Sequence, residues 1–379
     1  MICSQGSKFV AVLLVALSFW RVERSHAQSI VTTSASSRAD LAAQPMGRDF
    51  YFAAPESYQD QPGKSYSINI CANANATVHL QFPGKAADTL QLKVFRIRQF
   101  LMPLSWEIKT SGIVENKAIH IWCDNADLSV SILASDPYGS EGTQILPASA
   151  FGMDYVVASY NSLYEAIPYF SADYPSEFTV TAIADNTVLT ITPTQDIRDT
   201  SAIGVLHRRG VQFNEILQAG QAVQYKLTQA TSGTSFDATG TTIHSTKPIG
   251  VIGATQDANI PWNSQYPNFI CEAIPPIRTW GMRYYTAPFF GRKGGDTFLV
   301  IASADSQAIY TQDYNGKQLC ATLKKNAHFW VNDVATARAW TSDRPFLLMQ
   351  YSNSSQYSDA SNTVGFRTMM SVPPQSAFQ

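Results

Sequence analysis

Apolar and polar residues alternate along most of the chain with the two-residue period of a β-strand that has one buried face. The alternation is clearest in residues 178–184 and 188–192, which are separated by the pair Asp185-Asn186. Asp and Asn tolerate the backbone conformations of tight turns, which β-branched residues avoid. The 3.6-residue period of an amphipathic helix is nearly absent after the first 27 residues. This pattern predicts an all-β protein built from antiparallel hairpins.

Four short signals recur three times in the same order, which predicts three pseudo-repeats. A start that combines Gly and Tyr occurs at 47–51, 152–155 and 281–285. The hairpin turn described above has related copies at 74–78, 184–188 and 304–308. A unit of strand, tight turn and strand, with Pro after the turn in its two clearest copies, occurs at 119–130, 242–251 and 339–348. Linkers that contain Pro occur at 146–151, 274–280 and 372–378.

We place the repeats at residues 47–151, 152–280 and 281–379, after a linker at 28–46. Each copy spans roughly 100 to 130 residues, the size of one β-sandwich. Two architectures fit: tandem β-sandwich-like modules, or one closed β-propeller of about six blades in which each copy supplies two blades. Copies long enough to hold their own core favour sandwiches, whereas a simple run of hairpins favours a propeller. We expect the sandwich-like modules.

The first 27 residues have the organisation of a secretory signal peptide. Lys8 supplies the positive charge, residues 9–20 form the apolar core, and Ser25-His26-Ala27 offers a small-x-small cleavage site. The charged stretch 21–24 before this site is unusual for such a segment. The alternative is a transmembrane anchor, but that requires roughly 20 apolar residues, and this run is shorter. We therefore expect a secreted protein, with no later segment that spans or inserts into a membrane.

Secretion affects the interpretation of the cysteines that follow the signal peptide, which are Cys71, Cys123, Cys271 and Cys320. An even number of cysteines in an oxidising compartment favours disulfide bonds. Four cysteines allow three pairings, and the sequence does not choose among them. We favour Cys71–Cys123 with Cys271–Cys320, on the expectation that each bond lies within one repeat. The wide spacing is unlike the paired clusters of a zinc site, so no metal is expected.

Composition and charge narrow the range of partners. Of the 379 residues, 45% are apolar and 15% are charged, and the formal net charge is −2. The apolar share is ample for a core, so the surface must consist mostly of hydroxyl, amide and Tyr side chains. Without a basic stripe or a net positive charge, the chain has no field that attracts phosphates. We therefore expect no nucleic-acid partner.

Candidate catalytic groups are scattered along the chain. The histidines after the signal peptide are His79, His120, His207, His244 and His328. None accompanies a serine in a strand-to-helix nucleophile elbow. The carboxylate pairs Asp124/Asp127 and Asp196/Asp199 suit turns, and neither offers the several oxygens that calcium needs or the facing carboxylates of a glycosidase. We expect no enzymatic activity and no cofactor, and we retain a secreted hydrolase of polysaccharide as the alternative.

Loop aromatics are the candidate ligand-binding groups, because Tyr and Trp give a large contact area at low entropic cost. These candidates are Tyr160, Tyr164, Tyr169, Trp262 and Tyr266. The alternative is that such aromatics cover the joints between neighbouring repeats. Asn75 and Asn353 stand in Asn-x-Ser/Thr patterns and are candidate N-glycosylation sites.

Four strings in the second and third repeats resemble the IgG-Fc-binding domain family of mucus-associated proteins. They are the strand pair at 178–192, the Thr-Gly-Thr strand and Ser-x-Lys-Pro turn at 239–253, the Cys to Pro-Pro to Trp-Gly linker at 271–284, and the Gly-Arg to Gly-Asp-Thr stretch at 289–298. They occur in the family's order, and the resemblance is best over residues 152–379. Members often carry a cysteine near positions 257–261 that can pair with the one at Cys271. This chain has none there, so Cys271 must pair elsewhere or remain free.

The resemblance implies a secreted extracellular module for adhesion or association with mucus, without known catalytic residues. Its partner would be a protein or glycoprotein, mucin-like or immunoglobulin-like, bound through loops. The family name records the binding of IgG Fc by one member, and a shared fold does not specify a shared ligand. An immune or host-defence protein that binds another ligand is a further alternative.

Overall fold

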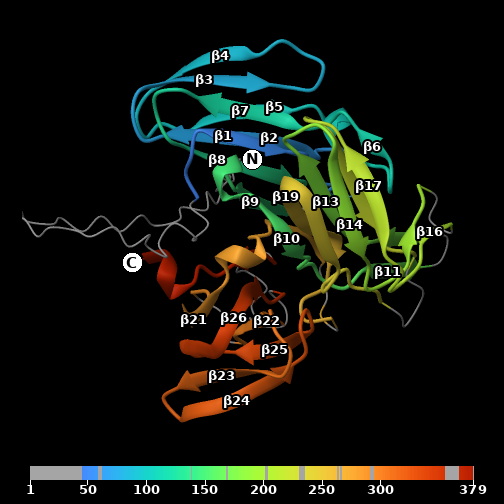
Figure 1. Ribbon diagram of the computed structural model, residues 1–379, viewed down its shortest axis with the longest axis vertical. Helices are drawn as coiled ribbons and strands as arrows, with labels where there is room; N and C mark the ends of the chain where they lie inside the picture. The colour runs from blue at the N-terminus through green and yellow to red at the C-terminus, as the bar shows by residue number, and fades with distance from the viewer. Residues whose placement is uncertain are drawn as a thin grey trace, which may run out of the picture. The chain divides into compact units, whose positions relative to one another are not determined.

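The computed structural model describes residues 45–58, 62–137, 139–167, 170–200, 204–229, 235–262, 264, 267–290, 294–354 and 367–378, and within 164–172 it describes no side chains. The predicted signal peptide and most of the predicted linker lie outside these residues. We use repeat 1, repeat 2 and repeat 3 for residues 47–151, 152–280 and 281–379. In Figure 1 they run from blue to green, from green to yellow and from orange to red.

Repeat 1 is a sandwich of two four-stranded antiparallel sheets, which we call layer A and layer B. Layer A has the order β1 (Asp49–Phe52), β7 (Ile119–Cys123), β3 (Ala76–Gln81) and β4 (Asp88–Leu92). Layer B has the order β5 (Arg98–Met102), β2 (Ser65–Ala72), β8 (Leu128–Ser135) and β9 (Ser140–Ile145). The β7–β8 unit is the strand, turn and strand that the sequence predicts here.

Repeats 2 and 3 use the same strand order, with one long strand in place of β7 and β8. In repeat 2, layer A has the order β10 (Gly152–Val156), β19 (Thr242–Ala258), β14 (Thr187–Thr192) and β17 (Phe213–Leu217). Layer B has the order β18 (Ala222–Lys226), β13 (Ser176–Ala182), β19 and β20 (Asn268–Ala273). In repeat 3, layer A has the order β21 (Gly281–Thr286), β26 (Arg338–Ser352), β23 (Gln307–Asp313) and β24 (Gly316–Leu323). Layer B has the order β25 (His328–Val334), β22 (Asp296–Ala302), β26 and β27 (Met369–Ser371).

The remaining elements are short connections. Two-stranded ribbons are formed by β11 (Leu163–Ile167) with β12 (Phe170–Tyr174) and by β15 (Ile197–Arg198) with β16 (Val205–His207), while β6 (Val114–Glu115) of repeat 1 pairs with β18 of repeat 2. The 3-10 helices are η2 (Leu104–Trp106), η3 (Ala148–Ala150), η4 (Ile277–Thr279) and η5 (Gln375–Phe378). No helix in the described part of the chain is long and apolar enough to cross a membrane. The all-β, sandwich-like prediction is confirmed, and the described strands do not form a propeller.

The predicted hairpins are wrong in their pairing in all three repeats, although their strands are where the sequence places them, and repeat 2 shows how. The strands β13 and β14 do not pair with each other: β14 pairs with the first half of β19, up to Ser245, and β13 pairs with the second half, from Ile249. The predicted strand, turn and strand at 242–251 is therefore one strand that bends at Pro248 from layer A into layer B. Pro345 stands at the same bend of β26. Proline lacks an N–H group, so it fits a bend where neither layer needs a backbone donor.

Each repeat buries its alternating apolar residues between its two layers. Phe50, Ile68 and Val78 are fully buried in repeat 1. The cores also extend across repeats, because Phe269 of repeat 2 belongs to the repeat 1 cluster and Met349 of repeat 3 belongs to the repeat 2 cluster. Burial of one such side chain contributes about 1.5–3 kcal/mol. The repeats therefore stabilise one another.

A close contact between glycine and proline closes each sandwich. A Cβ atom on the first glycine of a repeat would lie within 2.5 Å of a proline in the linker that ends the same repeat, in the pairs Gly47–Pro147, Gly152–Pro276 and Gly281–Pro374. This distance is well inside van der Waals contact, so any side chain at these positions would push the linker away. The glycine and the proline that recur in the sequence therefore contact each other in every repeat.

Candidate binding site

The outer face of layer A in repeat 3 forms an open groove with a volume of about 900 Å³. Its floor consists of small side chains on the central strand β26, where Ala339 and Thr341 face outward. The neighbouring strands carry larger side chains, because Tyr285 of β21 lies opposite Ala339 and Tyr310 of β23 lies opposite Thr341. Alternation along the strands thus puts small residues between two rows of large ones, and this difference in size creates the groove.

The groove combines exposed aromatic rings with charges of both signs. Tyr285 and Tyr314 are 56% and 84% exposed. The ammonium group of Lys317 lies 4.3 Å from the ring centroid of Tyr310, a cation–π distance. The remaining charged groups on the lining are those of Arg283, Asp313 and Asp343. Tyrosine rings offer apolar area and a hydroxyl with few rotatable bonds, so the groove suits recognition of a polymer with mixed apolar and polar groups.

On the equivalent face of repeat 1, large rings occupy the centre. The register places His120 and Trp122 where repeat 3 has Ala339 and Thr341. Their rings stack between Tyr51 and His79, with successive centroids 3.9, 4.3 and 4.9 Å apart. In repeat 2, the same face carries an exposed His244 whose Nδ1 lies 2.7 Å from Asp154 Oδ1.

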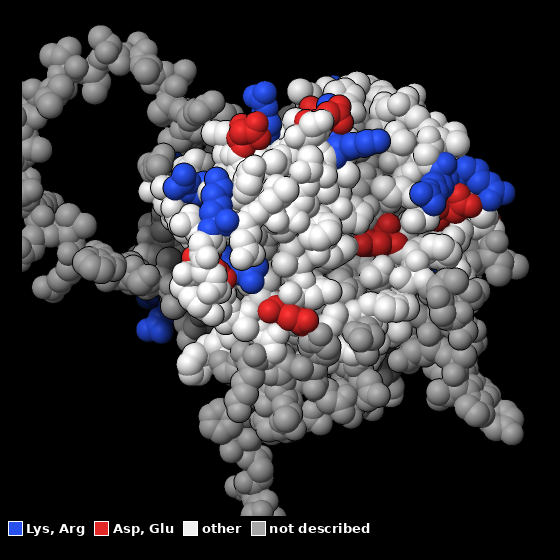
Figure 2. All heavy atoms as spheres, turned by 90° about the horizontal axis from the view of Figure 1, so that it is seen from below, with Lys and Arg blue, Asp and Glu red and all other residues white. Residues whose placement is uncertain are grey.

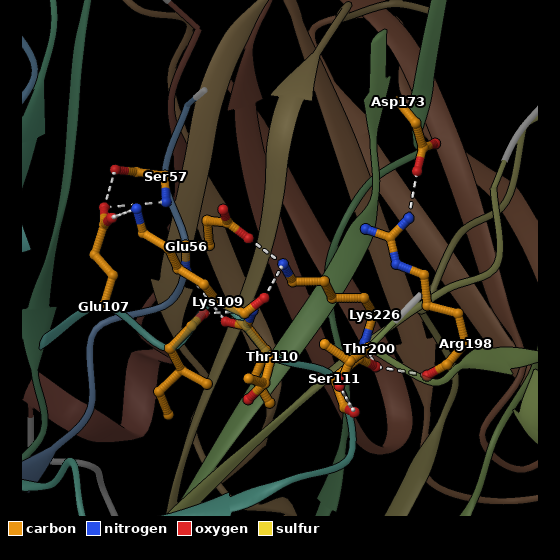
Figure 3. Close-up of polar contacts among 12 residues, drawn as sticks. Glu56, Ser57, Glu107, Lys109, Thr110, Ser111, Asp173, Arg198, Thr200 and Lys226 are labelled. Carbon is orange, nitrogen blue, oxygen red and sulfur yellow. Dashed lines mark hydrogen bonds and ion pairs between the residues drawn. The ribbon is translucent and has the colours of Figure 1, made fainter. Parts of the chain in front are cut away.

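A second polar cluster lies buried between repeats 1 and 2 (Figure 3). The Lys64 ammonium and the Glu107 carboxylate are 3.0 Å apart, and both side chains are fully buried. The Ser57 hydroxyl donates to Glu107 Oε1 at 2.7 Å. Burial raises the pKa of Glu107, and the charge of Lys64 opposes that rise. This pair fastens the segment after β1 to the segment after η2.

The same cluster continues into repeat 2 through Lys226 on β18. Lys226 Nζ pairs with Glu56 of repeat 1 and donates to the carbonyl oxygen of Lys109 at 2.9 Å. On the neighbouring strand β13, Glu177 stands opposite Lys226; it is fully buried and its carboxylate oxygens have no hydrogen-bond partner. Desolvation raises the pKa of Glu177 well above its usual value, and Lys226 is the principal charge that lowers it. The lysine therefore pairs with one carboxylate and lowers the pKa of a second at the boundary between the repeats.

Buried carboxylates with raised pKa values are candidates for acid–base catalysis when they reach a cleft. Here Glu107 and Glu177 are closed off from solvent and neither lines the groove. Asp196 of the sequence-predicted pairs holds a turn: its carboxylate accepts from Arg209 N at 2.7 Å, which lowers its pKa. No group of three or more His, Cys, Asp or Glu side chains in the described ranges is placed to hold a metal ion.

A third polar cluster joins the equivalent strands β9, β20 and β27 of the three repeats. Glu272 of β20 accepts from the Thr143 hydroxyl of β9 at 2.6 Å and from both the backbone N and the hydroxyl of Ser371 on β27 at 2.8 Å. Glu141 of β9 accepts from Thr368 and from the backbone N of Met369. Burial raises the pKa of Glu272 to about 7 and that of Glu141 well above its usual value.

The Glu272 cluster predicts that the fold loses stability as the pH rises through the acid-to-neutral range. In the folded chain Glu272 keeps its proton up to about pH 7, whereas the unfolded chain releases it near the ordinary glutamate pKa of 4.5. The folded state thus binds more protons between these values, so the unfolding free energy falls as the pH rises across them. Urea unfolding measured at several pH values across this range should show that the unfolding free energy falls less steeply with pH for Glu272→Gln than for the parent. Equal slopes would contradict the assignment.

The four cysteines are free thiols in the structure, so the predicted disulfide bonds are not formed. Cys71 and Cys123 lie in different layers of repeat 1, on β2 and β7. Cys271 is fully buried in the core of repeat 1, and burial raises its pKa well above the usual value. Cys320 packs against the core of repeat 3 with its pKa raised by burial to about 11. The expectation that Cys271 and Cys320 share a repeat is thus wrong, because β20 closes repeat 2 while β24 belongs to repeat 3.

The predicted ligand-binding aromatics divide into buried, exposed and undescribed residues. Tyr160 is buried: its ring packs against Trp330 and Tyr351 of repeat 3, with centroids 4.9 and 5.7 Å away. It therefore covers a joint between repeats, as the alternative interpretation held. Trp262 is 41% exposed. The side chain of Tyr164, and Tyr169 and Tyr266 altogether, lie outside the described residues.

The two glycosylation candidates have opposite surroundings. Asn75 is exposed in the turn between β2 and β3. Asn353 is fully buried, and its side-chain oxygen accepts from the Thr297 hydroxyl at 2.7 Å. The groove itself escaped the sequence interpretation, which searched loops, whereas its residues lie mostly on strands. The detectable signal is the small outward-facing pair Ala339 and Thr341 beside outward-facing tyrosines.

Seen from below the view of Figure 1, charged side chains of both signs lie interspersed on a mostly uncharged surface (Figure 2). In the comparison with known proteins, the sequence model of a family described as IgGFc binding protein matches residues 141–379, which is more than half of the chain. No curated protein and no solved structure matches. The matched range begins within β9 and includes repeats 2 and 3 with the groove.

Proposed function

The chain belongs to the IgGFc binding protein family, and from this we propose that it is a secreted, non-enzymatic module that binds an extracellular protein or glycoprotein through the groove of repeat 3. The observation that carries the proposal is the groove itself, an open face lined by exposed tyrosines, two cations and two carboxylates. It lies within the range that the family matches. The strand face thus replaces the loops as the proposed recognition surface.

The lining favours a protein or glycoprotein over a small molecule. Small-molecule sites bury most of their ligand in a mainly apolar cavity, whereas this groove is open and much of its lining is polar. Tyr, together with Arg, is enriched where protein surfaces hold most of their binding energy. Mixed charges add selectivity, because a partner must present complementary groups along the groove.

Removal of two groove tyrosines should weaken partner binding by at least about tenfold, because truncation of such residues commonly costs more than 1 kcal/mol each. The variant is Tyr285→Ala with Tyr314→Ala, and both side chains are exposed, so the fold should be retained. The measurement is biolayer interferometry of the purified protein on immobilised mucin glycoprotein and on immobilised IgG Fc. The matched control is Phe329→Ala, an aromatic that is 43% exposed on β25, outside the groove.

Retention of full affinity by the double variant would move the binding site away from the groove. Binding to Fc but not to mucin, or the reverse, would identify the partner class without changing the site. Turnover of a polysaccharide by the parent protein would contradict the non-enzymatic part of the proposal.

A further inference from the structure

The turn between β4 and β5 in repeat 1 has direct counterparts in the other two repeats. In each repeat, one backbone N–H group of this turn donates a hydrogen bond to the last carbonyl oxygen of a layer B strand, which is β2, β13 or β22. The pairs are Phe95 N to Ala72 O at 2.9 Å, Gly220 N to Ala182 O at 3.0 Å and Asn326 N to Ala302 O at 2.9 Å. The backbone N–H group of the preceding residue donates a hydrogen bond to the side-chain oxygen of an Asn or Asp residue. The pairs are Val94–Asn75, Ala219–Asp185 and Lys325–Asp305. The three turns are therefore the same structure with different side chains.

The donor residue of this turn has a left-handed backbone in all three repeats, with φ of 54° at Phe95, 78° at Gly220 and 63° at Asn326. Gly and Asn adopt this conformation readily, whereas a bulky side chain in it is sterically strained. Repeats 2 and 3 thus carry residues that suit the turn, and repeat 1 carries one that strains it. Strained backbone conformations of this kind cluster at functional sites, such as sites that bind a ligand or a partner.

Packing within the chain does not compensate for this strain. The Phe95 side chain is 61% exposed, and its neighbours Val94, Ile97 and Leu101 are 41%, 65% and 75% exposed. Three apolar side chains of one turn therefore stand in water, and Leu101 is exposed on the strand that follows, β5. Contiguous exposed apolar groups of this kind mark surfaces that bind a partner or a membrane.

Cations surround the apolar side chains. Lys93, Arg96 and Arg98 are all exposed, and none of them forms an ion pair with another residue that the structure describes. The adjoining loop contributes two carboxylates, of which Asp127 pairs with Arg48 at 3.1 Å, leaving Asp124 as the remaining negative charge. The neighbourhood of the turn is therefore both apolar and positively charged.

From these observations we propose that the turn at residues 93–97, with the start of β5 as far as Leu101, is a docking tip that inserts its apolar side chains into the surface of an anionic lipid bilayer. This proposal departs from the sequence-based expectation that no segment after the signal peptide inserts into a membrane. A turn is convex, so it offers no pocket to a peptide, but it can enter a deformable interface. Apolar side chains that enter the acyl boundary, with Lys and Arg at the level of the headgroups, form the general pattern of interfacial binding. The tip would hold the protein at a membrane surface and leave the repeat 3 groove for another partner.

The test is flotation of the full mature protein with liposomes of phosphatidylcholine alone and of phosphatidylcholine mixed with phosphatidylserine. The parent should float with the anionic liposomes and not with the neutral ones, and added salt should weaken the association. Phe95→Asn should reduce the bound-to-free ratio by at least about tenfold, because burial of one Phe side chain contributes more than 1.4 kcal/mol. Arg96→Gln with Arg98→Gln should reduce it as well.

The same Phe95→Asn variant separates a functional role from a structural one. Because Asn suits the left-handed turn, its thermal unfolding midpoint should rise above that of the parent while membrane binding falls. The matched control is Val211→Ser in repeat 2, where an exposed apolar residue follows the turn arginines Arg208 and Arg209, which contact Asp196. This control should leave flotation unchanged.

Four results would overturn the proposal. The first is absence of binding to anionic liposomes by the parent, and the second is equal binding by Phe95→Asn. The third is retention of the parent on immobilised polyglutamate without liposome binding, which would assign the tip to an acidic protein partner. A fall in the unfolding midpoint of Phe95→Asn would likewise show that the ring is held for folding.

Discussion

Lys226→Met is expected to lower the unfolding free energy by about 3–5 kcal/mol, which is the usual cost of removing one partner from a buried charge pair. Lys226 is the cation that Glu56 contacts and that stands opposite the fully buried Glu177. Without it, Glu177 must either remain charged in an apolar environment or take up a proton. Because Glu56 belongs to repeat 1, the loss should also loosen its contact with repeat 2.

Urea unfolding with linear extrapolation measures this effect. The double variant Lys226→Met with Glu56→Met should recover most of the loss, because it replaces the whole ion pair by apolar residues, which is often nearly neutral. The matched control is Arg208→Met, which breaks an ion pair on the surface, where the arginine side chain is 70% exposed. Exposed pairs contribute under about 1 kcal/mol. A single variant as stable as this control would show that Lys226 does not neutralise the cluster.

Tyr155→Phe is expected to lower the unfolding free energy by about 2–4 kcal/mol, because one hydroxyl satisfies two buried backbone groups. The Tyr155 hydroxyl accepts from Gly152 N at 2.9 Å and donates to Ile249 O at 2.6 Å. Its removal leaves one donor and one acceptor without partners, each at a cost of about 1–3 kcal/mol. Tyr284 makes the same two bonds in repeat 3, to Gly281 N and Phe346 O.

The matched control for this prediction is Tyr225→Phe. The Tyr225 hydroxyl is buried in the same repeat and has no hydrogen-bond partner, so its removal should be neutral or stabilising. Thermal and urea unfolding of both variants provide the comparison. If Tyr225→Phe cost as much as Tyr155→Phe, the loss would come from packing and not from the two hydrogen bonds.

The Gly and Tyr signal shows which features of the structure can be predicted from the sequence and which cannot. Its glycines are detectable as a repeat, but the role of each Tyr is not. The structure makes Phe50, three residues after Gly47, the counterpart of Tyr155. There Gly47 instead exchanges two direct backbone hydrogen bonds with Leu128. Tyr51, which the sequence pattern matched, corresponds to Tyr285 in the groove of repeat 3.

The sequence by itself determined the strands, the turns and the threefold recurrence, because two-residue alternation and turn chemistry are local properties of the chain. It also carried the family resemblance, which the match over residues 141–379 confirms. Only the tertiary structure decided which strands pair, since β13 and β14 meet different halves of β19 that lie fifty or more residues away. The groove depends on the same long-range register, which sets Ala339 beside Tyr285. Burial of Tyr160 and the separation of the cysteines likewise follow from contacts between repeats, and no local pattern encodes them.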